Sequence, residues 1–417
     1  MFPMNRWKRQ PLEQRTVHIA IRDGDRITLF PLDIRRDGNE FLIGRRDCKT
    51  YVAVPEVAVR IISMMNANCT IGEVRRRLQT DYDNVDDALD GFVLALLNSG
   101  FVDSIGSKAV AADSKTRIPR KTGIKRQHVA WLFSRTMMTA YALVILAGAA
   151  VFVLEPGIVP KPLAVLSAYP YWLFAILSLV TGIINVTKHE AAHVLAAASL
   201  GIRADLSIGH RMCFPVIQTD LTSLWAVPRK DRYIAYSAGI VSDLVTLSFI
   251  IITFWLNARG IVPFGETFVL LLTIALLVVT STVAWQFNFF MKTDVYYILA
   301  SALGCRNLQA DAVQYLRHLL RRSMRQPSAN PLDRIPLKEA RAVRFFSAIL
   351  AAGTSALIAG ASAYLYFVMD RHRVFGPADK AVLFFIFALT AGSVIFSVRR
   401  NRKPPKATYR LSAEARS

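Results

Sequence analysis

Apolar residues in this chain gather into six long blocks, all of them after residue 136. The blocks cover residues 137–154, 171–198, 233–257, 266–290, 343–369 and 379–398. Because roughly 20 helical residues cross the hydrocarbon core of a bilayer, each block predicts a membrane-spanning helix. No long apolar run precedes the first block, so we expect no cleavable signal peptide and expect the first span to direct insertion.

The connections between the blocks predict the orientation of the chain in the membrane. Basic residues concentrate before the first block, between the second and third, between the fourth and fifth, and after the sixth. The 155–170 and 258–265 connections hold one cation each, and the 370–378 connection, with Arg371 and Arg373, is the exception. Cytoplasmic loops carry an excess of Lys and Arg. We therefore expect a multi-pass protein of the cell membrane with both termini in the cytoplasm.

Composition supports a membrane protein rather than a nucleic-acid-binding one. Hydrophobic residues make up 53% of the chain, and the formal net charge is +21. The basic residues are spread over loops and tails, so we assign them to topology and anionic lipid, and expect no nucleic-acid partner. The cysteines show no C-x-x-C spacing and are predicted to be reduced packing residues. They are Cys48, Cys69, Cys213 and Cys305.

The first 105 residues are predicted to form a small soluble α/β domain. Period-two alternation predicts four short strands, and helical periodicity then predicts three helices. Thr70 and Glu73 have the spacing of a capping box, which would start the second helix. The predicted strands are Val17–Ala20, Arg26–Phe30, Phe41–Ile43 and Tyr51–Val54, and the predicted helices are Glu56–Asn66, Thr70–Tyr82 and Asn84–Gly100.

This order of elements, the T-x-x-E motif at Thr70 and the closing sequence Leu96–Val102 resemble the PqqD-like peptide-recognition domain. The resemblance implies a winged-helix-like module that binds the leader peptides of modified natural products. An unrelated winged helix that only packs or dimerises is the alternative. Residues 106–136 are predicted to be a basic linker, residues 137–398 the membrane domain, and residues 399–417 a basic cytoplasmic tail.

The second apolar block contains the sequence His189-Glu190-Ala-Ala-His193. Two histidines four residues apart lie on one face of a helix, so both imidazoles can reach one ion. Neutral imidazole is a good ligand for Zn²⁺, and a neighbouring carboxylate can take a proton from a zinc-activated water. Ionisable side chains at membrane depth are costly and are functional by default. We therefore predict a zinc site, with Glu190 as the catalytic base.

A catalytic zinc ion needs a third protein ligand and one open position. Asp294, at the end of the fourth block, is our candidate. In the predicted topology the second and fourth spans both run toward the cytoplasm, so the histidine motif and Asp294 lie at helix ends on the same side of the membrane. Asp243 is the alternative, either as a ligand or as a hydrogen-bond partner of one histidine.

The histidine motif, followed by Asn288 and Asp294 at this separation, resembles the site-2 protease family of intramembrane zinc metalloproteases. The stretch from Asp220 through Arg232, with Ala238-Gly239 after it, resembles the peptide zinc metalloprotease branch of that family. The resemblance extends over roughly residues 130–320. It implies a zinc metalloendopeptidase that hydrolyses a peptide or membrane-protein substrate, with Asn288 orienting the substrate or stabilising the oxyanion. Phe289 and Val295 depart from the proline and glycine of the family motif, and both lie on the backbone that presents Asp294.

Two functions follow from these predictions. One is a zinc-dependent endopeptidase that processes or exports a ribosomal peptide. The other is a non-proteolytic membrane protein for peptide export, immunity or scaffolding, in which zinc is structural or absent. The fold class predicted for both is mainly α, with six transmembrane helices and a small N-terminal α/β domain.

The remaining histidines are predicted to be surface residues, with His210 and Cys213 the one pair of note. These histidines are His18, His128, His210, His318 and His372. Residues 314–322 are predicted to form a basic amphipathic helix, which would lie either on anionic headgroups or with a solvated face.

Overall fold

The computed structural model describes ten segments of the chain, which fall into two compact units. The first unit holds the described residues between 22 and 110 together with 222–229, and the second holds the others. Most of the described chain is helical. The described segments are 22–37, 40–45, 50–81, 85–106, 108–110, 124–160, 169–202, 204–211, 214–305 and 307–370.

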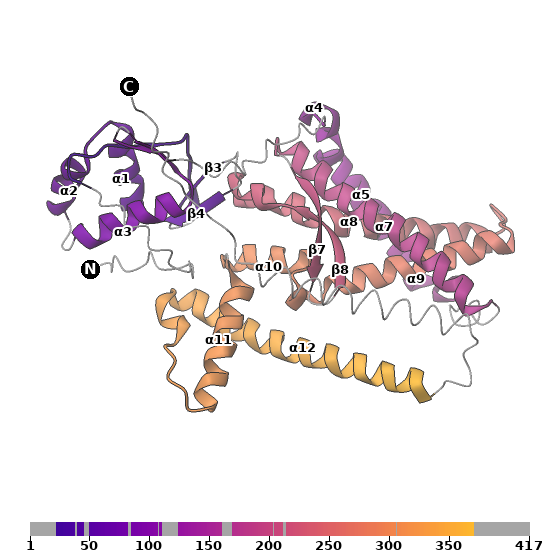
Figure 1. Ribbon diagram of the computed structural model, residues 1–417. Coiled ribbons are helices and arrows are strands. Elements are labelled where there is room, and N and C mark those ends of the chain that lie inside the picture. Colours follow the sequence, from indigo (N-terminus) through magenta and orange to yellow (C-terminus); the bar gives the residue numbers. More distant parts are fainter. Residues whose placement is uncertain are drawn as a thin grey trace, which may run out of the picture. The chain divides into compact units, whose positions relative to one another are not determined.

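The first unit combines three helices with two small antiparallel sheets (Figure 1). One sheet has the order β1-β5-β6 and the other β2-β3-β4. The helices are α1 (Glu56–Asn66), α2 (Ile71–Gln79) and α3 (Val85–Asn98). The strands are β1 (Ile27–Leu29), β2 (Asp33–Asp37), β3 (Glu40–Arg45), β4 (Thr50–Val54), β5 (Val102–Ile105) and β6 (Lys108–Ala109).

Local sequence explains where these helices begin and what they bury. The predicted capping box is present: Glu73 N donates to Thr70 Oγ1 at 3.3 Å, and Thr70 N donates to Glu73 Oε2 at 2.9 Å. The hydrogen bond from the Thr70 amide holds the pKa of the Glu73 carboxyl below its usual value. Apolar side chains at helical spacing on α1, including Ile61 and Ile62, enter a core shared with α2 and α3.

Most of the elements predicted for the first unit are confirmed. The three helices are present, and β1, β3 and β4 coincide with predicted strands. The second helix was predicted to reach Tyr82, which is wrong, because α2 ends at Gln79 and a turn follows. Strand β2 was not predicted, because its sequence Asp-Ile-Arg-Arg-Asp is polar on both faces. The predicted strand Val17–Ala20 and the Asn84 cap lie outside the described residues.

The second unit contains five helices among the described residues that are long and apolar enough to cross a membrane. Many of their apolar side chains are exposed, such as Leu146, Ile184 and Phe345, as expected where lipid covers them. The predicted sixth block, 379–398, lies outside the described residues. The five helices are α5 (Arg135–Leu154), α7 (Tyr171–Ser199), α8 (Arg229–Ala258), α9 (Glu266–Gln286) and α12 (Leu337–Asp370).

The two long connections predicted as basic loops contain further structure. The first holds an antiparallel hairpin of β7 (Asp205–Arg211) and β8 (Phe214–Asp220). The fourth apolar block was predicted as one helix to residue 290, which is wrong: α9 ends at Gln286, and a left-handed Lys292 (φ 58°) turns the chain. The remaining elements are α4 (Arg126–Val129), η2 (Ala130–Phe133), η3 (Pro156–Ile158), η4 (Thr222–Ala226), η5 (Phe289–Met291), α10 (Asp294–Leu303), α11 (Leu308–Ser323) and η6 (Pro331–Arg334).

One surface prediction for a histidine is wrong. His318 is buried, and its Nδ1 lies 3.1 Å from Ser328 Oγ, because the chain after α11 folds back over it. His128 is exposed, as predicted. Cys69 and Cys305 are buried, in agreement with a packing role. His18, His372, Cys48 and Cys213 lie outside the described residues, and His210 falls on β7.

Candidate metal centre

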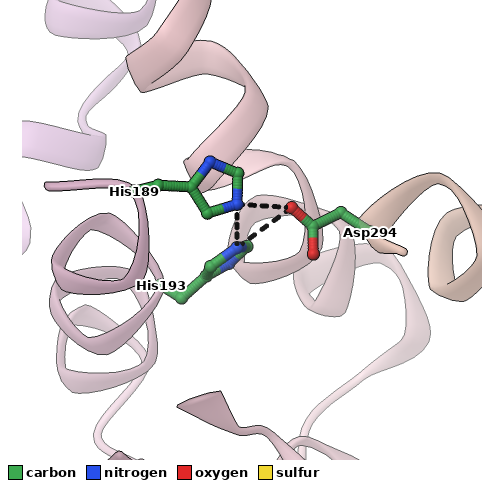
Figure 2. Close-up of side chains that lie close together, drawn as sticks. All are labelled: His189, His193 and Asp294. Carbon is green, nitrogen blue, oxygen red and sulfur yellow. Dashed lines mark hydrogen bonds and ion pairs between the residues drawn. The ribbon is translucent and has the colours of Figure 1, made fainter. Parts of the chain in front are cut away.

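Helix α7 and the first residue of α10 bring three buried side chains to one point (Figure 2). His189 Nε2 lies 2.9 Å from Asp294 Oδ2, and His193 Nε2 lies 3.1 Å from the same oxygen. The two imidazole nitrogens are 3.2 Å apart. All three side chains are more than nine-tenths buried. The three residues predicted as ligands therefore lie together, and the group could hold a metal ion.

Hydrogen bonds on the far side of each ring define its tautomer. His189 Nδ1 is 2.7 Å from Asp243 Oδ2, and His193 Nδ1 is 2.7 Å from the carbonyl oxygen of Ala235. A carboxylate and a carbonyl oxygen only accept hydrogen bonds, so both Nδ1 atoms carry the proton and donate it. In the neutral form of each ring, Nε2 then presents a lone pair toward Asp294, which is the arrangement of metal-ligating histidines.

Three electron-pair donors converge on one point, and a cation there would hold them together. Two imidazole lone pairs and a carboxylate oxygen repel one another unless a proton or a metal ion lies between them. Donor atoms at zinc-bonding distance around a tetrahedral ion are about 3.3 Å apart. The observed separations of 2.9, 3.1 and 3.2 Å are close to that value. The donor set and its spacing fit Zn²⁺.

The end of α9 fixes the start of α10 and so the position of Asp294. Gln286, the last residue of α9, accepts a hydrogen bond from Asp294 N through Oε1 at 3.0 Å. Its carbonyl oxygen accepts from Thr293 Oγ1 at 2.6 Å. Its Nε2 lies 3.4 Å from His189 Nε2. A single buried glutamine therefore connects the carboxylate-bearing turn to one histidine.

The backbone turn that leads to Asp294 is anchored from the C-terminal side. The ring of Phe290 packs so closely on Gly353 of α12 that a Cβ there would lie 2.5 Å from Phe290 Cδ1. Gln309 of α11 donates through Nε2 to the carbonyl oxygen of Phe290 at 2.7 Å. These contacts hold the turn that contains Phe289 and Phe290 and that leads to Asp294.

Helix α8 passes close to the histidine rings at Gly239. A Cβ added at Gly239 would lie 2.6 Å from His193 Nε2 and 2.5 Å from His189 Cε1. Real Cβ atoms do not approach other atoms so closely, so only glycine leaves room for the rings and an ion. Residue 239 is thus part of the wall of the cluster.

Asp243 is itself held by Lys188, the residue before the histidine motif. Lys188 Nζ lies 3.1 Å from Asp243 Oδ1, and it donates to Thr246 Oγ1 at 2.6 Å and to the carbonyl oxygen of Ser242 at 3.2 Å. Asp243 is fully buried, so its charge needs this partner. Lys188, Asp243 and His189 form a chain of contacts that ends at the ligand cluster.

Glu190 faces the β7–β8 hairpin. Its Oε2 accepts hydrogen bonds from Thr219 N at 2.7 Å and from Thr219 Oγ1 at 2.6 Å. Thr219 lies on β8, and Glu190 is 7% exposed. The hairpin therefore holds the carboxylate that follows the first histidine.

The structure shows where the remaining predicted site residues, Asp243 and Asn288, lie. Asp243 contacts Nδ1 of His189 and does not join the three converging donor atoms, so of its two predicted roles its position fits that of hydrogen-bond partner. Asn288 is the N-cap of η5, where its carbonyl oxygen accepts from Met291 N at 2.8 Å, and its role toward a substrate stays a prediction. The sequence did not predict that four further residues contact the site: Lys188, Thr219, Gly239 and Gln286. No protein-family model, curated protein or solved structure matches this chain.

Proposed function

We propose that this protein is a zinc-dependent membrane endopeptidase of the site-2 type. The single observation that carries the proposal is that His189 and His193 of α7 meet Asp294 of α10, next to the buried Glu190. Five candidate spans support a place in the membrane. We further propose that residues 379–398 form a sixth span and that both termini are cytoplasmic, as the distribution of basic residues predicts.

His189, His193 and Asp294 would hold the zinc ion. When bound, zinc supplies Lewis acidity, both to a water molecule and to the scissile carbonyl group. Glu190 accepts the proton of the attacking water as its oxygen bonds to the carbonyl carbon, and then donates that proton to the amine nitrogen as the C–N bond breaks. Both hydrogen bonds from Thr219 reach Oε2, so we assign proton transfer to Oε1. Asn288 is proposed to orient the substrate or stabilise the oxyanion.

The substrate class we propose is a peptide or a membrane-protein segment. The first unit would bind a peptide and deliver it, in keeping with the resemblance of its sequence to peptide-recognition domains. Its two sheets have edge strands, to which a peptide could add, and the unit has a hydrophobic core of its own. Both features are consistent with an independently packed binding module.

The test is Glu190→Gln in the full-length protein, with cleavage of a mixed peptide library and metal content measured on the same sample. A missing general base lowers turnover by about 100- to 10,000-fold, while the three ligands keep the metal. Undiminished cleavage by the variant would refute the mechanism. His128→Ala, which alters an exposed histidine far along the sequence from the motif, is the matched control and leaves both values unchanged.

One observation favours the non-proteolytic alternative. Glu190 already accepts two hydrogen bonds from β8, so it is also suited to anchoring the hairpin. In that case the metal is structural, wild-type protein carries metal without cleaving any peptide, and Glu190→Gln keeps its biological function. Cleavage by metal-loaded wild-type protein would exclude this alternative.

A further inference from the structure

The C-terminal half of α11 exposes apolar and basic side chains together. Leu320 is 60% exposed and Met324 is 53% exposed, although both are large and apolar. Four arginines accompany them, and between Asp311 and Asp333 the sequence contains no acidic residue. The arginines, all of them exposed, are Arg317, Arg321, Arg322 and Arg325.

This end of the helix is held in one conformation. Leu320 and Arg321 accept hydrogen bonds through their carbonyl oxygens, from Met324 N at 3.1 Å and from Gln326 N at 2.9 Å. Arg325 adopts a left-handed conformation, with φ 56°, as is common where helices end. The contact between His318 and Ser328 fastens the following chain to the helix. The exposed groups are therefore displayed on a fixed surface.

The opposite face of α11 packs against the start of α12 (Figure 1). Leu308 and Ala312 of α11 share a buried cluster with Val343 and Phe346 of α12. Ser347 Oγ lies 3.4 Å from the carbonyl oxygen of Ala312. The candidate span of α12 begins at Leu337, so α11 is fixed beside the end of a helix that enters the membrane.

We propose that the exposed face of α11, defined by Leu320, Met324, Arg317 and Arg321, binds the anionic phospholipid headgroups of the membrane that α12 enters. Guanidinium groups pair with phosphate oxygens in a bidentate way, and Leu320 and Met324 enter the acyl boundary. Anionic lipids attract basic segments next to a span. A second copy of the chain is disfavoured as the occupant, because it would place the arginines of this face against the same arginines of the other copy.

The test uses full-length protein in nanodiscs of phosphatidylcholine alone or mixed with phosphatidylglycerol, with Leu320→p-benzoylphenylalanine as a photo-cross-linking probe. We expect cross-linked phosphatidylglycerol in the mixed discs, and at least a threefold loss when Arg317→Glu and Arg321→Glu are added. Arg317→Lys with Arg321→Lys keeps the charge and therefore keeps most of the cross-linking. Neither zinc nor proteolytic activity is needed.

The same probe at Leu146, an exposed residue inside the α5 candidate span, is the matched control. It reports insertion, and its lipid cross-linking should be the same with and without charge reversal. Lipid at Leu146 but none at Leu320 would overturn the proposal, as would equal cross-linking of Leu320 in both kinds of disc. Cross-linking of Leu320 to a second protein chain would overturn it as well, in favour of a protein interface.

Discussion

The carboxylate of Asp243 accepts a hydrogen bond from Nδ1 of His189 at 2.7 Å, and both side chains are buried. This contact fixes the ring so that Nε2 faces the other two donors. Lys188 balances the charge of Asp243 from the opposite side. The orientation of His189 thus depends on Asp243 and Lys188, and neither of them contributes one of the three converging donor atoms.

Loss of this support weakens metal binding without removing a ligand. We expect Asp243→Asn to lower zinc affinity by about 10- to 100-fold, because the asparagine amide no longer accepts the Nδ1 proton as a charged partner. Lys188→Met should have an effect of the same sign, since it leaves a buried carboxylate without its ammonium partner. Competition with a chromophoric chelator measures both. An unchanged affinity in both variants would contradict the supporting role of Asp243.

Metal content distinguishes a ligand cluster from a hydrogen-bonded one. We expect purified wild-type protein to carry about one zinc per chain, as a site with three protein ligands and one open position does. His193→Ala and Asp294→Ala should each reduce the content severalfold, as measured by elemental analysis. Asp311→Ala, which alters a carboxylate on α11, is the control for loss of an acidic residue as such. Equal metal in all four proteins would place the ion elsewhere.

A single methyl group added at residue 239 should displace the histidine rings and prevent metal binding. Gly239→Ala adds a Cβ where the His193 ring nitrogen would be 2.6 Å away, so the rings must move apart. We expect zinc binding to be lost while the protein still folds in detergent. Gly182→Ala on α7 adds the same methyl group where no atom lies within 4 Å, and it should bind zinc like the wild type.

Acid should loosen α2 through Glu73. Its pKa is lowered in the folded protein, so the stabilisation is complete above the unfolded value and is lost as the pH falls through the folded one. Hydrogen exchange of the α2 amides should therefore accelerate, relative to the intrinsic rate, as the pH falls below the ordinary pKa of a glutamate. Glu73→Gln keeps an acceptor oxygen without titrating and should show no such change. Thr70→Ala should destabilise α2 by about 1 kcal/mol at all pH values.

The sequence predicts the ligands better than their surroundings, for a physical reason. His189, His193 and Asp294 are ionisable residues in or beside apolar blocks, and such residues are conspicuous because burying them is costly. The helical repeat places the histidines on one face, and the positive-inside rule brings Asp294 to the same side. Gly239 and Gln286 carry no charge, and their contacts depend on how α8 and α9 pack.

The same difference appears in the connections. The β7–β8 hairpin was predicted as a loop because its segment is short and flanked by basic residues. The apolar stretch after Gln286 was predicted to continue α9, yet the turn at Lys292 is set by Gly353 and Gln309, which lie far along the chain. Local pattern therefore predicts helix faces and ionic chemistry, whereas tertiary contacts decide where the backbone turns.

Thr219 reaches Glu190 partly through its peptide group, and this limits what mutagenesis can do. Replacing the side chain deletes the hydroxyl contact, but every residue except proline still offers the amide hydrogen. The hydrogen bonding of the Glu190 carboxylate is consequently tied to where the strand lies rather than to which residue occupies it. A shift of the hairpin as a whole would release Oε2 from both hydrogen bonds at once.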